Sequence, residues 1–179
     1  MKIKTNFYFL EMHVLTLGLP GSGKGVLAEK LSERFGYEVI GMDKYRYGEN
    51  WRKKSFEEFR ISLMNEINKD DKPKIIEGAY NDEVRIKVVQ ELLPLIKKIL
   101  IIRPESLEVT IAQLIDRSIN RFIGKEKSGT CIESSKDRAC LVIDNVQNYE
   151  ENVDVLLGDF SDNPKAIFDN RDALAFFDF

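Results

Sequence analysis

The chain has 179 residues, with 27 Lys and Arg against 30 Asp and Glu, which gives a formal net charge of −3 at pH 7. This length predicts one domain, residues 1–179, that can bury a core without disulfides or structural metals. The near-neutral balance does not indicate a broad surface for nucleic acid, although it leaves room for a local basic groove.

The cysteines and the apolar runs set expectations for the compartment. Cys131 and Cys140 lie nine residues apart, and the only histidine is His13. This is not the spacing of a zinc site, so we interpret both as reduced thiols of a cytoplasmic protein. No run reaches the roughly 18 apolar residues of a membrane-spanning helix, and we expect no membrane partner. Polar residues interrupt the apolar start of the chain, so we expect residues 7–10 to form an added strand or the lead-in to the first strand rather than a secretory signal.

Short apolar runs alternate with amphipathic stretches along the chain. The runs predict strands, and the 3.6-residue repeats predict helices. Gly36 is placed to end the first helix, and Ser55 with Glu58 forms a capping box that opens the second. Such alternation predicts an α/β fold with a five-stranded parallel sheet flanked by helices. The expected strands are 14–17, 37–40, 74–76, 98–102 and 166–168, and the expected helices are 26–35, 55–69, 82–93, 105–122 and one ending near 157.

Residues 18–26 read GLPGSGKGV and lie between the first expected strand and the first expected helix. The pattern G-x-x-x-x-G-K supplies glycines where backbone amides close on phosphate oxygens, a lysine for the β and γ phosphates, and a helix N-terminus facing the anion. The alternative is a glycine-rich turn that happens to carry a lysine. The residues expected to bind ATP here are Gly18, Pro20, Gly21, Ser22, Gly23, Lys24, Gly25 and Val26.

Gly25 and Val26 stand where many such loops carry a Ser or Thr that contacts magnesium. The variant GxPGxGKG resembles the loop of adenylate kinases and related nucleoside monophosphate kinases, in which a glycine follows the lysine. In that family the next residue is usually Thr, which Val26 replaces. Mg²⁺ would then be held by nucleotide oxygens, water and carboxylates elsewhere. The resemblance spans about residues 14–160 and implies a P-loop kinase fold with a lid.

Asp43 and Arg46 follow the second expected strand, at the sheet edge where parallel folds bind ligands. An Asp there can hold a water on magnesium or accept a proton from a hydroxyl acceptor, and Arg46 can clamp an anionic acceptor. The alternative is a helix N-cap followed by a surface arginine. The string resembles nucleoside monophosphate kinases, in which such a pair binds the acceptor phosphate. It also resembles polynucleotide 5′-hydroxyl kinases, in which Asp-x-Tyr-Arg holds the general base.

Glu77 closes the third expected strand, where P-loop proteins commonly carry an acidic residue for magnesium. A solvent-facing carboxylate is the alternative. The segment that reads Asp-Gly-Phe-Pro-Arg in nucleoside monophosphate kinases is 77–81 here, so Asn81 replaces the acceptor-binding arginine and Arg85 lies one helical turn further on. We expect the metal to be reached through water by Asp43 and Glu77, and the acceptor to be bound by Asp43, Arg46, Glu77, Asn81 and Arg85.

Arg117 and Arg121 are spaced i, i+4 near the end of the fourth expected helix. Two cations on one face repel, which favours a shared anionic partner, whereas a solvated helix end is the alternative. The string LIDRSINR resembles the adenylate kinase segment that leads into the lid, where two arginines contact the donor nucleotide. We expect 123–138 to be a short lid that excludes water, with Arg138 returning from it to the phosphates.

These residues predict an ATP- and Mg²⁺-dependent phosphotransferase with Lys24, Asp43, Arg117 and Arg121 as catalytic residues, and the resemblance favours a nucleoside monophosphate acceptor. One alternative is a hydroxyl kinase with Asp43 as base, acting on a polynucleotide 5′ end or a small metabolite; only the former involves nucleic acid. The glycine after Lys24 favours the monophosphate kinase, and Asn81 favours the hydroxyl kinase. Another alternative is an ATP-binding regulatory protein with little turnover, which Gly25 and Val26 permit.

Overall fold

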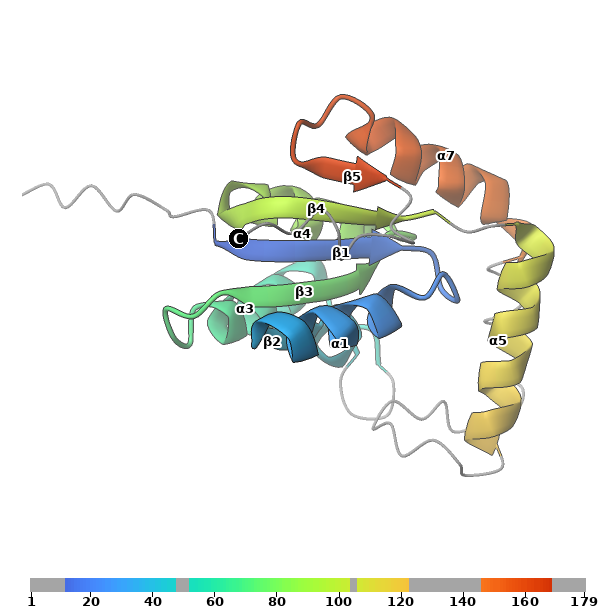
Figure 1. Cartoon of the computed structure of the whole chain (residues 1–179), viewed down its shortest axis with the longest axis horizontal. Coiled ribbons are helices and arrows are strands. Elements are labelled where there is room, and N and C mark those ends of the chain that lie inside the picture. Colours follow the sequence, from blue (N-terminus) through green and yellow to red (C-terminus); the bar gives the residue numbers. More distant parts are fainter. Residues whose placement is uncertain (1–11, 48–51, 104–105, 123–145, 169–179) are drawn as a thin grey trace, which may run out of the picture.

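The computed structural model describes residues 12–47, 52–103, 106–122 and 146–168. Five parallel strands form one sheet in the order β2-β3-β1-β4-β5 (Figure 1). The predicted α/β fold with a five-stranded parallel sheet flanked by helices is therefore confirmed. The strands are β1 (His13–Gly18), β2 (Glu38–Gly41), β3 (Lys74–Ala79), β4 (Ile96–Ile102) and β5 (Ala166–Phe168).

The helices begin and end where local chemistry directs them. Gly36 ends α1 in a left-handed conformation (φ 71°), and its N–H donates to the carbonyl of Ser32. The Ser55 hydroxyl accepts from the Glu58 N–H and the Glu58 carboxylate accepts from the Ser55 N–H, which confirms the capping box. The helices are α1 (Lys24–Phe35), α2 (Met42–Arg46), α3 (Phe56–Ile67), α4 (Glu83–Leu92), the 3₁₀ turn η2 (Leu93–Leu95), α5 (Leu107–Phe122) and α7 (Tyr149–Phe160).

Helices cover both faces of the sheet, as the apolar strands require. Successive residues of the central strands alternate between two cores. One core joins the sheet to α3, α4 and α7 and includes Leu15, Leu17, Ile76, Ile99, Ile101, Phe59, Leu63, Val88 and Phe160. The other joins the sheet to α1 and consists of Val14, Ile75, Leu100, Ala28 and Leu31. In Figure 1, α1 lies in front of the sheet and α3 behind it, while α5 stands beyond the strand ends.

Parallel pairing gathers the carboxyl ends of the strands at one edge. Gly18 at the end of β1 pairs with Ala79 of β3, and Gly41 at the end of β2 pairs with Glu77. The segments that follow β1, β2 and β3 therefore begin next to one another. This edge contains residues 18–26, the predicted phosphate-binding loop, and the residues predicted to bind the acceptor.

The structure does not reach every predicted feature. Residues 7–10 and the lid 123–138, with Arg138, lie outside the described residues. No helix in the described part of the chain has the length and apolar character needed to cross a membrane.

At the end of the sheet where the strands begin, His13 and Lys74 are buried side by side as the first residues of β1 and β3. The imidazole Nδ1 of His13 accepts a hydrogen bond from the Lys74 N–H at 3.1 Å. The Lys74 amine lies 2.5 Å from the carboxylate of Asp70. Burial, and then the positive charge of Lys74, hold the pKa of His13 below its ordinary value. The imidazole is therefore neutral in the folded protein near neutral pH.

We expect acid to destabilise the fold through His13 before the carboxylates titrate. In the unfolded chain His13 takes up a proton near pH 6.5, whereas the folded protein resists protonation, so the unfolded state binds more protons and the free energy of unfolding falls as the pH falls below 6.5. Urea unfolding at several values between about pH 7.5 and 5.5 measures the slope. His13→Asn should flatten it, because an amide oxygen can accept from the Lys74 N–H without titrating. Equal slopes in both proteins would reject this account.

Candidate active site

The loop between β1 and α1 is shaped by two glycines in the left-handed region. Gly21 has φ 82° and Gly23 has φ 88°, and Gly23 is the N-cap of α1. No side chain caps this helix, so its first N–H groups are left for another acceptor. A Cβ placed on Gly23 or Gly25 would meet no atom within 4 Å, so there is open space beside both residues at the start of the helix. An uncapped helix N-terminus facing open space fits an anion such as a polyphosphate.

The Lys24 amine lies inside this loop. The side chain is buried, and its Nζ donates to the carbonyl of Leu19 at 3.4 Å. Nζ also lies 3.6 Å from Oε1 of Glu77, whose side chain is 21% exposed. Glu77 therefore faces the phosphate-binding loop rather than open solvent. A lysine and a carboxylate in this arrangement can meet a nucleotide phosphate and a hydrated metal ion side by side.

The carboxylates fit magnesium better than a metal held by the protein alone. Within the described ranges, no group of three or more His, Cys, Asp or Glu side chains could enclose an ion. Mg²⁺ typically keeps several waters and takes one or two carboxylates together with substrate phosphates. Glu77, next to Lys24, can supply such a carboxylate.

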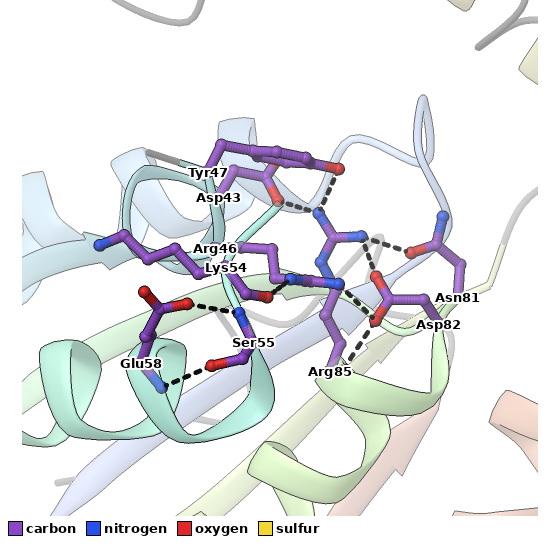
Figure 2. Close-up of polar contacts among 9 residues, drawn as sticks. All are labelled: Asp43, Arg46, Tyr47, Lys54, Ser55, Glu58, Asn81, Asp82 and Arg85. Atoms are coloured by element: carbon purple, nitrogen blue, oxygen red, sulfur yellow. Dashed lines mark hydrogen bonds and ion pairs between the residues drawn. The ribbon is translucent and has the colours of Figure 1, made fainter. Parts of the chain in front are cut away.

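Asp43 lies in the first turn of α2, and Arg85 of α4 holds its carboxylate (Figure 2). Nη2 of Arg85 donates to Oδ1 of Asp43 at 2.5 Å and to the hydroxyl of Tyr47 at 3.3 Å. Nη1 donates to Asn81 and Asp82 at 2.9 and 2.7 Å. The Asp43 side chain is 51% exposed, whereas that of Arg85 is only 5% exposed. Burial lowers the pKa of Arg85, but Asp43, Tyr47 and Asp82 outweigh it and raise the pKa above its ordinary value.

Arg46 points into the protein rather than outward. Its side chain is buried, one guanidinium nitrogen donates to the carbonyl of Lys54, and Nη2 lies 3.8 Å from Oδ1 of Asp82 (Figure 2). The N-cap of α2 is Gly41, so the alternative of an Asp N-cap followed by a surface arginine does not describe this segment. Arg46 and Arg85 both contact Asp82, and they join α2 to the start of α4.

Helix α5 packs against the phosphate-binding loop. A Cβ on Gly21 would lie 3.1 Å from Cγ of Leu114 and 3.3 Å from the carbonyl of Thr110, and both residues are buried. Positions 117 and 121 belong to α5, three and seven residues beyond Leu114. The side chains of Arg117 and Arg121 lie outside the described part of the structure. Their contact with the donor nucleotide stays a prediction.

Two further residues of this edge were given no role of their own from the sequence. Tyr47 contacts Arg85 both through its hydroxyl and through its ring, whose centroid lies 5.5 Å from the guanidinium carbon. Tyr47 lies four residues after Asp43, and this spacing could have indicated that the two side chains lie close together. Tyr80 follows β3 and donates to Oδ2 of Asp159 at 2.6 Å, which ties α7 to this edge. Burial, and then the bond to Asp159, raise the pKa of Tyr80 above its ordinary value.

Comparison with protein-family models and with curated proteins found no match. Among solved structures, a gluconokinase from Sinorhizobium meliloti 1021 is similar with a TM-score of 0.51 and 17% identity, over 88% of this chain and 81% of that one. A sugar kinase from Janibacter sp. HTCC2649 is also 17% identical, with a TM-score of 0.43, over 86% of this chain and 96% of that one. The first likeness shows that this chain shares the fold of that gluconokinase.

The two ends of α1 provide a matched test of the phosphate-binding loop. Gly23→Ala and Gly36→Ala each place a methyl group in open space at a left-handed position, so each should cost roughly 1–2 kcal/mol of stability. Only Gly23→Ala adds a methyl group at the N-terminus of α1, where the phosphates are predicted to bind, so only this variant should lose affinity for ATP. Titration calorimetry with ATP and urea unfolding measure the two effects. Equal ATP affinity in both variants would show that the nucleotide binds elsewhere.

Proposed function

We propose that this protein is an ATP-dependent kinase that transfers the γ-phosphoryl group to a hydroxyl group of a small molecule. The observation that carries the proposal is the half-exposed carboxylate of Asp43, held by a buried arginine at the sheet edge that also forms the phosphate-binding loop. The donor side and the acceptor side support the proposal separately.

The donor side of the site suits a nucleoside triphosphate. The open, uncapped N-terminus of α1 offers backbone N–H groups to phosphate oxygens, and the Lys24 amine is held at the same loop. Lys24 would bind the β and γ phosphates and stabilise the charge on the transferring group. Glu77 would hold Mg²⁺ through water, and the ion when bound neutralises charge on the phosphates.

The acceptor side suits a neutral hydroxyl better than a phosphate monoester. A phosphate acceptor is anionic at neutral pH and needs cations that are free to pair with it. Arg46 and Arg85, the arginines predicted for that role, are buried and are balanced by Asp82 and Asp43. A phosphate placed here would meet the exposed Asp43 carboxylate, which repels it. A hydroxyl would meet the same carboxylate as a hydrogen-bond acceptor.

In the proposed reaction, the acceptor hydroxyl takes the γ-phosphoryl group of ATP and gives its proton to Asp43. The acceptor oxygen attacks the γ-phosphorus, the bond from that phosphorus to the bridging oxygen breaks, and ADP leaves with the electron pair. The hydroxyl proton passes to the free oxygen of Asp43, which acts as the general base. The acceptor thereby gains a phosphate ester, and the proton returns from Asp43 to water.

The choice of a small acceptor rests on the structural neighbour, since a gluconokinase is by name a kinase of a small hydroxylated metabolite. One observation still supports a nucleoside monophosphate as the acceptor, namely the glycine that follows Lys24 in the loop. Labelled ATP with a panel of sugars, sugar acids, polyols, nucleoside monophosphates and a 5′-hydroxyl oligonucleotide distinguishes these acceptors. Transfer to an alcohol and not to monophosphates is the expected result.

Replacing Lys24 tests phosphoryl transfer itself. We expect Lys24→Ala to lower kcat about 100- to 1000-fold, because backbone amides cannot replace the lysine charge on the transferring group. Lys30→Ala is the matched control, because it removes a lysine from the exposed face of the same helix. Both variants should remain folded. Equal turnover in all three proteins would reject the kinase proposal and favour an ATP-binding regulatory protein.

Replacing Asp43 separates the two kinase chemistries. With an alcohol acceptor, Asp43→Asn should lower kcat about 100- to 10,000-fold, and the remaining rate should rise with pH because hydroxide replaces the lost base. Added Mg²⁺ should not restore it. Asp71→Asn, which removes an exposed carboxylate from the turn before β3, should behave as wild type.

A different response of Asp43→Asn would support a monophosphate acceptor, which attacks through an oxygen that is already anionic. The variant would then retain appreciable turnover, raised Mg²⁺ would partly restore the rate, and the rate would not climb with pH. Rate measurements at several pH values and Mg²⁺ concentrations decide between the two.

A further inference from the structure

The exposed carboxylate of Asp43 is supported from beneath by a buried cation. Arg85 contacts only Oδ1, and Oδ2 forms no hydrogen bond within the described part of the chain. Asp43 itself lies on α2, a helix of five residues that follows the edge strand β2. So short a helix restrains its side chains little, and the direction of the carboxylate therefore depends on Arg85.

The guanidinium of Arg85 is itself fixed on several sides. Asn81 and Asp82 accept from Nη1, the Tyr47 hydroxyl accepts from Nη2, and the Tyr47 ring lies against the guanidinium (Figure 2). A planar guanidinium held this way presents its remaining N–H groups in one direction. The bond to Asp43 thus transmits a fixed orientation from α4 to the exposed side chain.

Joining α2 to α4 does not require this bond. Arg46 already connects the same two helices through Asp82. An exposed carboxylate is solvated by water and needs no cation for folding, and exposed ion pairs typically contribute little to stability. The bond from Arg85 to Asp43 is therefore better explained by the position that it gives to the carboxylate.

We propose that Arg85 is a positioning residue, which orients the Asp43 carboxylate so that Oδ2 receives the proton of the hydroxyl acceptor. This inference rests on the proposed function, because it assigns Arg85 to the base of that reaction. Arg85 would act through Asp43 without touching the acceptor. A reacting group displaced by about 1 Å can lose about 100-fold in rate, which sets the size of the expected effect.

A double-mutant cycle tests the proposal, with turnover per folded molecule measured on the alcohol that the panel identifies. We expect Arg85→Gln to lower kcat about 100-fold while the affinity for ATP stays unchanged. In the Asp43→Asn background the same change should have no further effect, because the group that Arg85 orients is gone. Arg85→Lys should also lose rate, since an ammonium cannot reach Asp82 and Asp43 with the same geometry. This variant carries the test where Arg85→Gln does not fold.

Arg60→Gln is the control. It removes an arginine of α3 that pairs with Glu57 and with Glu91 of α4, and no contact with Asp43 is present among the described residues. Its kcat should equal that of wild type, whereas the Arg85 variants should show a loss of kcat that disappears in the Asp43→Asn background.

The outcomes separate the two proposals. Losses at Arg85 and Asp43 that multiply in the double variant would show that Arg85 acts independently of Asp43. A lower melting temperature with unchanged kcat would show that Arg85 is only structural. Each of these overturns the positioning role while the proposed kinase stands. Absence of wild-type transfer to any alcohol would overturn the proposed function, and the positioning role with it.

Discussion

The parallel pairing of β3 with both β1 and β2 is the constraint on which this site depends. It places the ends of three strands at neighbouring positions, so that the loop after β1, helix α2 after β2 and the turn after β3 begin side by side. Residues 24, 43 and 77, far apart in the chain, come to one edge for this reason alone. Any slip in this register would move Glu77 away from Lys24 and break their ion pair.

Two buried arginines hold the segments that follow the ends of β2 and β3. Helix α2 has five residues, too few to be stable without tertiary contacts. Arg46 attaches it to Lys54 and Asp82, and Arg85 of α4 contacts Asp43 on the helix. The carboxylate of Asp82 is shared by both arginines, and that of Asp43 is half-exposed. Burying a cation is costly unless it is paired and hydrogen-bonded, and these partners meet that requirement. The buried Nε atoms of Arg46 and Arg85 have no hydrogen-bond partner among the described residues.

The sequence was a good guide wherever the signal is local or periodic. The strands from β1 to β5, the capping box at Ser55 and the C-cap at Gly36 follow from patterns of a few residues. Helix α2 was expected only as an alternative, because five residues carry no measurable period. The direction in which Arg46 and Arg85 point was missed for another reason. From the sequence, Arg46 could pair with a bound phosphate or with a carboxylate of the protein. Its actual partner, Asp82, lies 36 residues further along the chain. The roles of Arg117, Arg121 and Arg138 remain predictions, since their side chains lie beyond the described part of the structure.

The proposed donor half of the site consists mainly of backbone groups, and the proposed acceptor half consists of side chains. This difference explains why the sequence predicted the donor half and not the contacts of the acceptor half. The donor half consists of backbone: glycine conformations, helix N–H groups and one lysine, all set by a single stretch of nine residues. The acceptor half consists of side chains from α2, α4 and the turn between β3 and α4, which meet only in the folded protein. A substitution at Asn81 or Tyr47 can therefore change what the acceptor half binds without disturbing the phosphate-binding loop. The loop accordingly supports the proposed phosphoryl donor, whereas the balance of charge around Asp43 and Arg85 supports the proposed acceptor.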